Sequence, residues 1–137
     1  MNDSLAIVLF SGTADKLTAA ANIAAGAVAL GREVTLFLTF AGLLAFRKND
    51  WRHNQALSAD QGRYAEEIRA ALQQSDLPSW LQILQDAREL GTLRVAACLM
   101  TLDMFHLKLT DLEPLVTETA AVGNLFAADR QSDVLFI

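Results

Sequence analysis

The sequence predicts an α/β sandwich with a mostly parallel sheet of about five strands. Short apolar runs rich in branched residues alternate with segments of helical periodicity, and the first half contains a β-α-β unit. Apolar residues make up 53% of the chain, which is enough for a sizeable core. The 137 residues, without repeats or a linker, therefore predict one domain over 1–137.

Five segments are predicted to form strands. They are LAIVLF (5–10), EVTLFLTF (33–40), LRVAAC (93–98), EPLVTE (113–118) and DVLFI (133–137). Continuous apolar runs such as the first are typical of strands buried on both faces of a parallel sheet. The helical segment between the first two strands predicts parallel pairing with a right-handed crossover.

Helices are predicted where apolar side chains recur at helical spacing. The predicted helices cover 14–30, 63–74, 76–91, 99–107 and 120–131. Thr13 is a plausible N-cap for the first helix, and Gly31 is well placed to end it. The segment 49–62 is polar and has no clear period, so we expect a mobile loop or a poorly packed excursion near a site.

The charge and hydropathy patterns argue against two classes of partner. Eleven basic and sixteen acidic residues give a net charge of −5, and no Lys/Arg run supplies the positive surface that nucleic-acid binding needs. Residues 17–46 are apolar but are split by two charges into pieces shorter than the ~20 residues of a membrane span. We expect no integral membrane segment, although Trp51, Trp80 and Phe46 leave peripheral membrane association as a minor alternative.

The cysteine content and the N-terminus bear on location. Cys98 is the single cysteine of the chain, so no internal disulfide can form, which suits a reducing compartment. The N-terminal MNDSLAIVLFSG lacks the basic start of a signal peptide. Together these features predict a cytoplasmic protein.

Ligands in parallel α/β sheets gather at the carboxyl ends of the strands. Ser11 and Gly12 follow the first predicted strand, Thr39 and Phe40 end the second, and Cys98 ends the third. If these strands are neighbours, the residues meet on the rim of one pocket.

The role of Cys98 has two readings from spacing alone. A helix is predicted to begin just after it, and the free N–H groups of a helix start lower the pKa of a cysteine and favour the nucleophilic thiolate. The alternative is a buried, protonated thiol of the core. His53 and His106 match no metal-ligand spacing with it, and SGTADK lacks a Gly-rich phosphate cradle, so we expect neither a metal nor a cofactor.

Two stretches, roughly 5–47 and 76–137, are similar to one known family. The first contains the family's Ser-Gly turn, Ala-rich helix and following strand, with matching residues Ala27, Gly31, Val34, Phe37, Thr39, Phe40, Gly42 and Leu43. The second has ACLMTLD where the family has A-C-x-M-S-M-D, and closes with VGNLFAADRQSDVLFI. The chain thus resembles the DsrE/DsrF-like family of small sulfur-relay proteins, in particular the branch sometimes labelled a peroxiredoxin family.

This resemblance implies a flavodoxin-like three-layer sandwich in which Cys98 carries sulfur as a persulfide. It further implies a sulfurtransferase-type role, a sulfur donor or acceptor protein as partner, and a homo-oligomer such as a trimer or hexamer. The residues expected to bind a ligand beside the cysteine are Ser11, Gly12, Thr39, Phe40, Met100 and Asp103. Some relay proteins lack the active cysteine, so the alternative is a non-catalytic oligomeric module that binds a ligand or a partner.

The chain departs from the family pattern in places. A charged helix is predicted within 48–75, where the branch has a Gly- and Met-rich segment. Thr101 replaces the usual Ser, Leu102 replaces Met, and His106 stands where Gly is common. Peroxide reduction is disfavoured because no second cysteine is present, and Arg94, the nearest basic residue in sequence, is expected about 13 Å from the thiol at ~3.3 Å per residue.

Overall fold

A parallel sheet of five strands forms the centre of the protein. The computed structural model describes residues 3–74, 76–126 and 132–137. The strands are β1 (Ser4–Leu9), β2 (Glu33–Leu38), β3 (Leu93–Cys98), β4 (Glu118–Ala120) and β5 (Ser132–Phe136). They lie in the order β4-β3-β2-β1-β5, and every neighbouring pair is parallel. The α/β prediction is therefore confirmed, and the sheet is entirely parallel.

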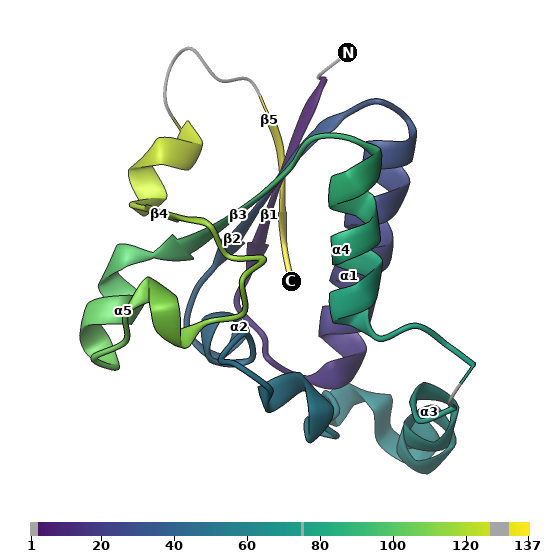
Figure 1. Ribbon diagram of the computed structural model, residues 1–137. Coiled ribbons are helices and arrows are strands. Elements are labelled where there is room, and N and C mark those ends of the chain that lie inside the picture. Colours follow the sequence, from purple (N-terminus) through teal and green to yellow (C-terminus); the bar gives the residue numbers. More distant parts are fainter. Residues whose placement is uncertain (1–2, 75, 127–131) are drawn as a thin grey trace.

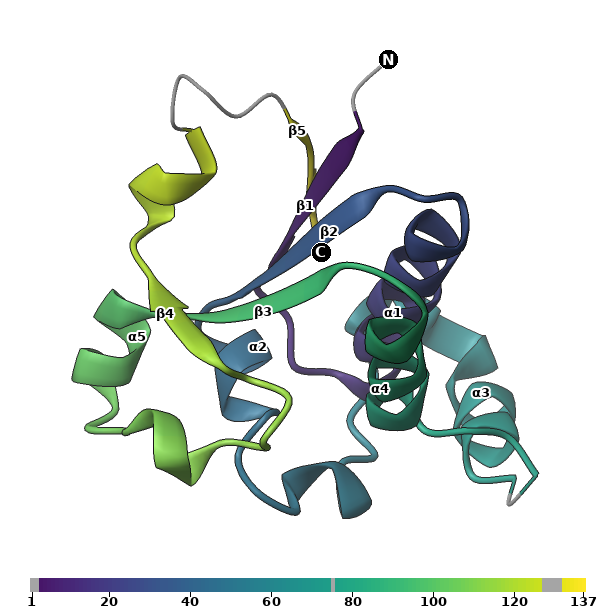
Figure 2. The same ribbon diagram turned by 45° about the horizontal axis from the view of Figure 1, so that its top comes forward.

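Two long helices cover one face of this sheet. They are α1 (Ala14–Ala29) and α4 (Trp80–Leu90), which lie side by side in Figures 1 and 2. The shorter α-helices are α2 (Ala41–Leu44), α3 (Ala65–Leu72) and α5 (Leu99–Met104). The described ranges contain no helix that is both long enough and apolar enough to cross a bilayer.

The main core lies between the sheet and these two helices. Alternate strand residues such as Ile7, Leu36 and Val95 are completely buried there. The small side chains of Ala21 and Ala24 let α1 pack closely on the strands. This rigid half of the molecule positions the carboxyl ends of the strands, where the candidate site lies.

The opposite face of the sheet has a thinner cover. A small buried cluster on this face contains Ala6, Phe37, Cys98 and Leu125. Leu125 comes from the 3₁₀ helix η4 (Val122–Phe126), which lies on this side together with α5 (Figure 2). The third layer predicted from the family resemblance is thus made by short helices.

The helix predicted over 76–91 begins later than expected. A residue that precedes proline disfavours the helical conformation, and Pro78 therefore keeps Leu77 outside α4. Ser79 is the N-cap, and its side chain accepts a hydrogen bond from the Gln82 N–H at 3.1 Å. Leu77, which falls within the predicted helix but outside α4, is 51% exposed.

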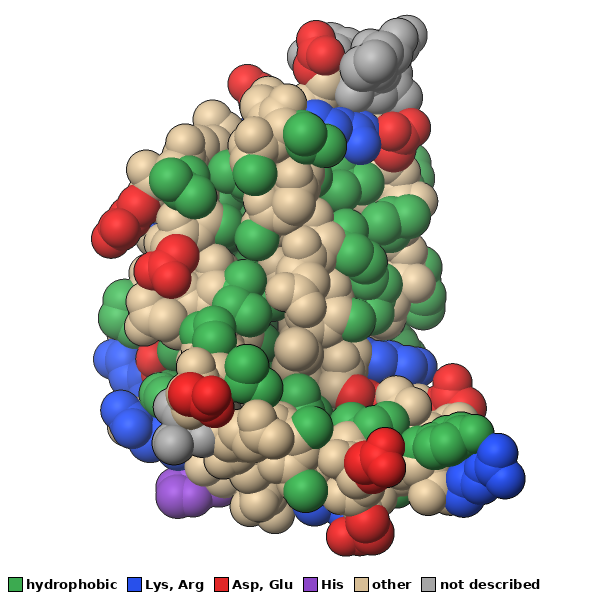
Figure 3. Space-filling model, turned by 90° about the vertical axis from the view of Figure 1, so that its right-hand side faces the viewer, with side chains coloured by type: hydrophobic (Ala, Val, Ile, Leu, Met, Phe, Trp, Pro, Cys, Tyr) green, Lys and Arg blue, Asp and Glu red, His purple; other side chains and the backbone are tan. Residues whose placement is uncertain are grey.

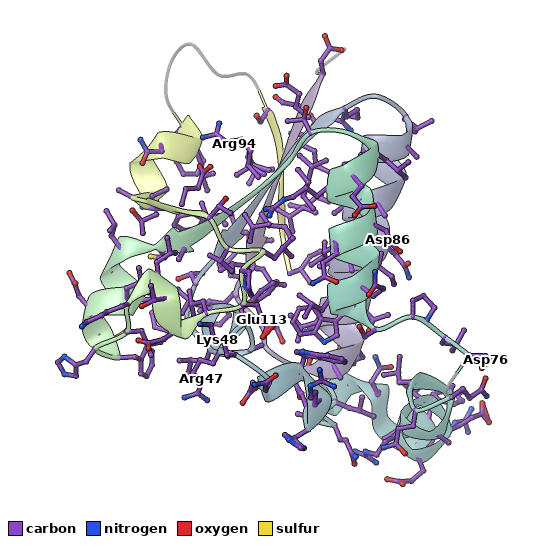
Figure 4. The ribbon with its side chains drawn as sticks, viewed as in Figure 1. Arg47, Lys48, Asp76, Asp86, Arg94 and Glu113 are labelled. Carbon is purple, nitrogen blue, oxygen red and sulfur yellow. The ribbon has the colours of Figure 1, made fainter. Side chains whose placement is uncertain are left out.

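The fourth strand is also displaced from its predicted place at 113–118. The Glu113 N–H donates to the Phe46 carbonyl at 2.7 Å, and the Glu113 carboxylate accepts from the Asn49 N–H at 2.9 Å. Figure 4 shows Glu113 near Arg47 and Lys48. The start of the predicted strand is therefore held by the chain after α2, and pairing with β3 begins only at the end of that segment.

The polar segment 49–62 carries regular structure rather than an open loop. It contains η1 (Asp50–Arg52) and most of η2 (Ala59–Tyr64). The Asn54 side-chain amide donates to the Gly12 carbonyl at 2.8 Å, which ties the segment to the start of α1. Of the helix predicted over 120–131, only η4 is seen, and residues 127–131 lie outside the described part of the chain.

Candidate functional site

Cys98 lies where the carboxyl end of β3 meets the first turn of α5. It is the last residue of β3 and the N-cap of α5, with an extended backbone at φ −64° and ψ 122°. The sequence prediction of a helix directly after the cysteine is therefore confirmed. The side chain is only 4% exposed and contacts the small cluster that includes Phe37 and Leu125.

Two threonines place hydroxyl groups beside this thiol. Thr39 follows β2, Thr101 lies in the first turn of α5, and both are buried. Their Oγ1 atoms share a hydrogen bond of 3.1 Å. The Thr101 hydroxyl also accepts from the Phe40 N–H at 3.2 Å, so it connects α5 to the turn after β2.

The pKa of Cys98 is lowered from its ordinary value. Burial is the largest single influence and acts in the opposite direction, because it disfavours the thiolate. The backbone N–H and the hydroxyl of Thr101, the hydroxyl of Thr39 and the backbone N–H of Met100 together outweigh it. The thiol makes no capping hydrogen bond itself, but a thiolate would occupy the position from which an N-cap side chain accepts from the second and third helical N–H groups.

The backbone beside this group is strained at Phe40. Its φ of 50° and ψ of −130° are rarely adopted by a residue with a side chain. The Phe40 ring lies 5.2 Å from the Phe10 ring, which in turn stacks on Phe136 at 5.5 Å. A row of three aromatic rings thus follows the carboxyl edge of β2, β1 and β5.

Ser11 and Gly12 lie away from Cys98, on the far side of β2. They line a cavity of about 590 Å³ at the start of α1, to which Lys16 and Arg47 contribute positive charge. Cys98 is not among the residues that line this cavity. Because β2 lies between β1 and β3, the turn after β2 contacts both of the others: Phe40 packs against Phe10, and Thr39 lies beside Cys98, whereas Ser11 and Gly12 line the cavity at the start of α1.

Met100 and Asp103 belong to α5 and relate to the thiol differently. The Met100 backbone N–H acts on Cys98, whereas its side chain is 57% exposed. The Asp103 side chain is exposed, and no hydrogen bond or ion pair among the described residues joins its carboxylate to Cys98. Of the six predicted ligand-binding residues, the structure therefore groups Thr39, Phe40 and Met100 around the cysteine.

No basic side chain is among the main influences on the pKa of Cys98. Arg94 forms an ion pair with Glu118 of β4, at 2.8 Å, on the same face of the sheet. Figure 4 shows Arg94 near η4 and well removed from α5. Within the described ranges, no group of three His, Cys, Asp or Glu side chains is arranged to hold a metal ion.

The comparisons with known proteins agree with this fold. The model of the DsrE/DsrF/DrsH-like family matches residues 1–64. An uncharacterized protein of Bacillus subtilis (strain 168), YrkE, is 30% identical over 152 residues, which cover 96% of this chain and 94% of that protein. The chain belongs to the DsrE/DsrF/DrsH-like family. Cys98 lies outside the residues that the family model matches, so its role rests on the local geometry.

The structure gives physical meaning to two departures from the family pattern. Thr101 keeps the hydroxyl of the usual Ser, which is the group that contacts Thr39 and Phe40. His106 has a φ of 55° just beyond the end of α5, a position that favours glycine. Sequence reasoning did not place Thr101 among the site residues, although its position three residues after an N-cap is where capping partners occur.

Proposed function

We propose that this protein carries sulfane sulfur on Cys98 as a persulfide and passes it to another molecule. The observation that supports the proposal best is the set of hydrogen-bond donors around the sulfur, two backbone N–H groups and two threonine hydroxyls. Such donors favour a thiolate, which is the nucleophilic form of cysteine. Membership of the family supports the same role.

The proposed transfer is balanced in atoms and electrons. The Cys98 thiolate attacks the outer sulfur of a donor persulfide, forming a new S–S bond, while the donor S–S bond breaks and the donor leaves as a thiol. An acceptor thiolate then attacks the outer sulfur of the Cys98 persulfide and releases Cys98 as a thiolate. Because the chain has no second cysteine, no internal disulfide competes with this second step.

The side chains around Cys98 control access to its sulfur. Cys98 is 4% exposed in the single chain, so a donor reaches it only when its cover moves. Leu125 of η4 is part of that cover, and η4 is a short 3₁₀ element on the thinly covered face of the sheet. We expect loosening of η4 to uncover the thiol.

Intact-mass measurement after incubation with a donor persulfide, glutathione persulfide, tests the proposal. We expect wild type to gain one sulfur atom per chain and Cys98→Ala to gain none. A sulfur-loaded wild type should then return to its original mass when a thiol acceptor is added. No gain of sulfur by wild type, or an equal gain by Cys98→Ala, would show that the proposal is wrong.

Burial of Cys98 favours a second candidate, a non-catalytic module that binds a ligand or partner. Under this reading the thiol is a packed residue of the small cluster with Ala6 and Phe37. A slow alkylation rate and a thiol pKa at or above that of free cysteine would support it. Alkylation kinetics over a range of pH therefore separate the two candidates.

We further propose that the protein is a homo-oligomer, as the family resemblance implies. Val134 and Phe136 of β5 lie on the thinly covered face and are 41% and 70% exposed. Val122 and Phe126 of η4, on the same side, are 54% and 67% exposed. Several large apolar side chains exposed on one face are typical of an interaction site. We also propose a cytoplasmic location, because a free cysteine that must remain reduced suits a reducing compartment.

A further inference from the structure

A second cavity lies on the other side of the molecule, away from Cys98. It has a volume of about 520 Å³ and lies between the helical layer and the segment 50–79. Volumes of this size are typical of small-molecule sites. None of its lining residues belongs to the cluster around the thiol. The walls come largely from the segment in which the chain departs from the family pattern.

Hydrogen bonds to the start of α1 hold one wall of this cavity in place. The Ala14 N–H donates to the Ala56 carbonyl at 2.7 Å, and the Ser58 N–H donates to the Asp15 carboxylate at 3.1 Å. The opposite wall is formed by the turn before α4 and by the first turns of that helix, from Leu77 to Ile83. Figure 3 shows this side of the molecule, with the helical layer above and charged side chains of both signs at the foot.

The inner surface of the cavity is mainly apolar and aromatic. Both tryptophans of the chain line it, together with Leu57, Leu72 and Ile83. Trp80 is 5% exposed and packs edge-on against Phe46, whereas Trp51 is only partly buried. An apolar or aromatic ligand body would replace water mainly on Trp51 and on the partly buried Leu57, Leu72 and Ile83, since Trp80 is already covered.

The charged residues of the lining are exclusively basic. They are Arg52 and Arg69, and no aspartate or glutamate lines the cavity. None of the ion pairs among the described residues involves Arg52, whose guanidinium lies 4.5 Å from the centre of the Trp51 ring. Arg69 pairs with Glu66, but that carboxylate is 88% exposed, so solvent screens much of its charge. Asp76 is close to the lining residues in sequence, but it lies at the outer tip of the turn before α4 and does not line the cavity (Figure 4).

We propose that this cavity binds a small organic carboxylate whose apolar body lies against Trp51 and the aliphatic side chains of the lining and whose charge pairs with Arg52 and Arg69. Guanidinium groups suit a carboxylate because they donate charge-assisted hydrogen bonds to it, and Arg69 is held toward the segment before η2 by a bond from its Nε to the Gln55 carbonyl at 3.3 Å. The body is either aromatic or aliphatic, since indole rings and leucine side chains accept both. This inference is independent of the sulfur chemistry proposed for Cys98.

Calorimetric titration of the full chain with matched ligands tests the proposal. The probes are 1-naphthaleneacetate and decanoate, each compared with its neutral amide, so that the charge changes while the body is kept. We expect at least one carboxylate to bind about 10-fold or more tightly than its amide, as one charge-assisted hydrogen bond supplies. The two bodies distinguish an aromatic from an aliphatic ligand. Equal binding of acid and amide, or no binding of either acid, would overturn the proposal.

Variants locate the bound carboxylate. Arg52→Gln and Arg69→Gln should each weaken binding about 10-fold, whereas Arg63→Gln, an exposed arginine outside the lining, should not. Leu77→Glu, at a residue 51% exposed, adds a negative charge to the lining and should also weaken it. Binding of decanoate should also shift the fluorescence emission maximum of tryptophan, because tryptophan side chains line the cavity. Binding that survives Arg52→Gln and Leu77→Glu together would place the ligand elsewhere and refute the proposal.

Cys98→Ala separates this inference from the proposed function. The variant leaves the cavity lining intact, so carboxylate binding should be unchanged even though sulfur loading is lost. Conversely, Arg52→Gln should load sulfur as wild type does. A loss of carboxylate binding in Cys98→Ala would contradict the separate location of the two sites.

Discussion

The reactivity of Cys98 depends on hydroxyl groups that two different segments deliver. Thr39 comes from the end of β2, and Thr101 from the first turn of α5. No charged side chain is among the main influences on the pKa of Cys98, which are burial, two backbone N–H groups and the two threonine hydroxyls. Neutral donors therefore replace the cationic partner that many reactive cysteines use.

Thr39→Val should raise the pKa of Cys98, because it removes one donor to the thiolate while keeping the size of the side chain. We expect alkylation by iodoacetamide at pH 7 to slow several-fold and the midpoint of the rate–pH profile to move upward. Thr101→Ser keeps the hydroxyl and should leave the midpoint close to that of wild type. A midpoint unchanged by Thr39→Val would contradict a role for this hydroxyl.

The left-handed backbone conformation of His106 affects the stability of the protein. The Leu107 N–H donates to the Leu102 carbonyl at 2.9 Å, which closes α5 around the left-handed residue between them. His106→Gly should stabilise the protein by up to ~1 kcal/mol, since glycine adopts a positive φ without a steric cost. Chemical denaturation measures the change. His53→Gly is the control, because the φ of His53 is −115° and no such gain is expected there.

At the scale of elements, two glycines fix how α2 meets the end of β1. A Cβ at Gly12 would lie 2.4 Å from the Ala41 carbonyl oxygen, and a Cβ at Gly42 would lie 2.1 Å from the Leu9 carbonyl oxygen. No side chain fits in either position without movement of the backbone. This contact holds the turn after β2, and with it Thr39 and Phe40, beside the strands.

Gly42→Ala should therefore destabilise the protein by at least ~2 kcal/mol, because the methyl group can be accommodated only if α2 moves. Alkylation of Cys98 should change as well, since Thr39 shifts with α2. Gly26→Ala is the matched control, because Gly26 is an exposed residue within α1 and has nothing within 4 Å of the added Cβ. It should stabilise by ~0.5–1 kcal/mol. Thermal and chemical denaturation compare the two variants.

The attachment of η2 to α1 depends on Asp15. Its pKa is lowered: burial raises it, but the Gln61 side chain at 2.6 Å, the Thr13 hydroxyl, and the Ser58 and Lys16 N–H groups more than compensate. A lowered pKa in the folded state means that the carboxylate stabilises the fold above its unfolded pKa of ~3.9, and that this stability is lost as the pH falls through the folded pKa.

Asp15→Asn should accordingly free the segment 58–64 at pH 7, with a global cost below ~1 kcal/mol because the group is partly exposed. Hydrogen exchange of this segment should become faster in the variant than in wild type. The difference should shrink as the pH is lowered through the folded-state pKa of Asp15, where wild type loses the same charge. Glu67→Gln, on the exposed side of α3, should leave the exchange unchanged across this pH range.

The central strands are predicted well from the sequence because the apolar patterns that indicate them are local. The apolar run at 5–10 and the strand that ends at Cys98 are found within one residue of their predicted bounds. The 3₁₀ helices and the late start of β4 depend instead on tertiary hydrogen bonds, such as that from Glu113 to Phe46, which no local pattern reveals.

Prediction of the candidate site was also limited by contacts that no local sequence pattern reveals. The grouping of Cys98 with Thr39 follows from two neighbouring strands, and the sequence placed both residues at strand ends. The sequence did not show that Ser11 lines a separate cavity at the start of α1, because the strand order, with β2 in the middle, is a property of the whole sheet. Thr101 was overlooked because its hydroxyl matters only once α5 turns back toward Phe40.

At the scale of the whole molecule, the two faces of the sheet are unequally covered. The α1 and α4 face is closed by two full helices, whereas the described residues cover the opposite face with η4, α5 and their connections (Figure 1). Parallel sheets are normally buried on both faces. In the proposed oligomer a second chain packs on this opposite face, beside the row of aromatic rings that ends at Phe136.

Phe136→Asp should therefore lower the mass of the protein in solution toward that of one chain. The residue is 70% exposed, so the change costs the isolated chain little, but a buried unpaired carboxylate in an interface is costly. Sedimentation velocity measures the mass of wild type and variant at the same concentration. Leu30→Asp, at a residue 84% exposed beyond the end of α1, should leave the mass unchanged. A wild type that sediments as a monomer, or a Phe136→Asp variant that stays assembled, would rule out this face as the contact between copies.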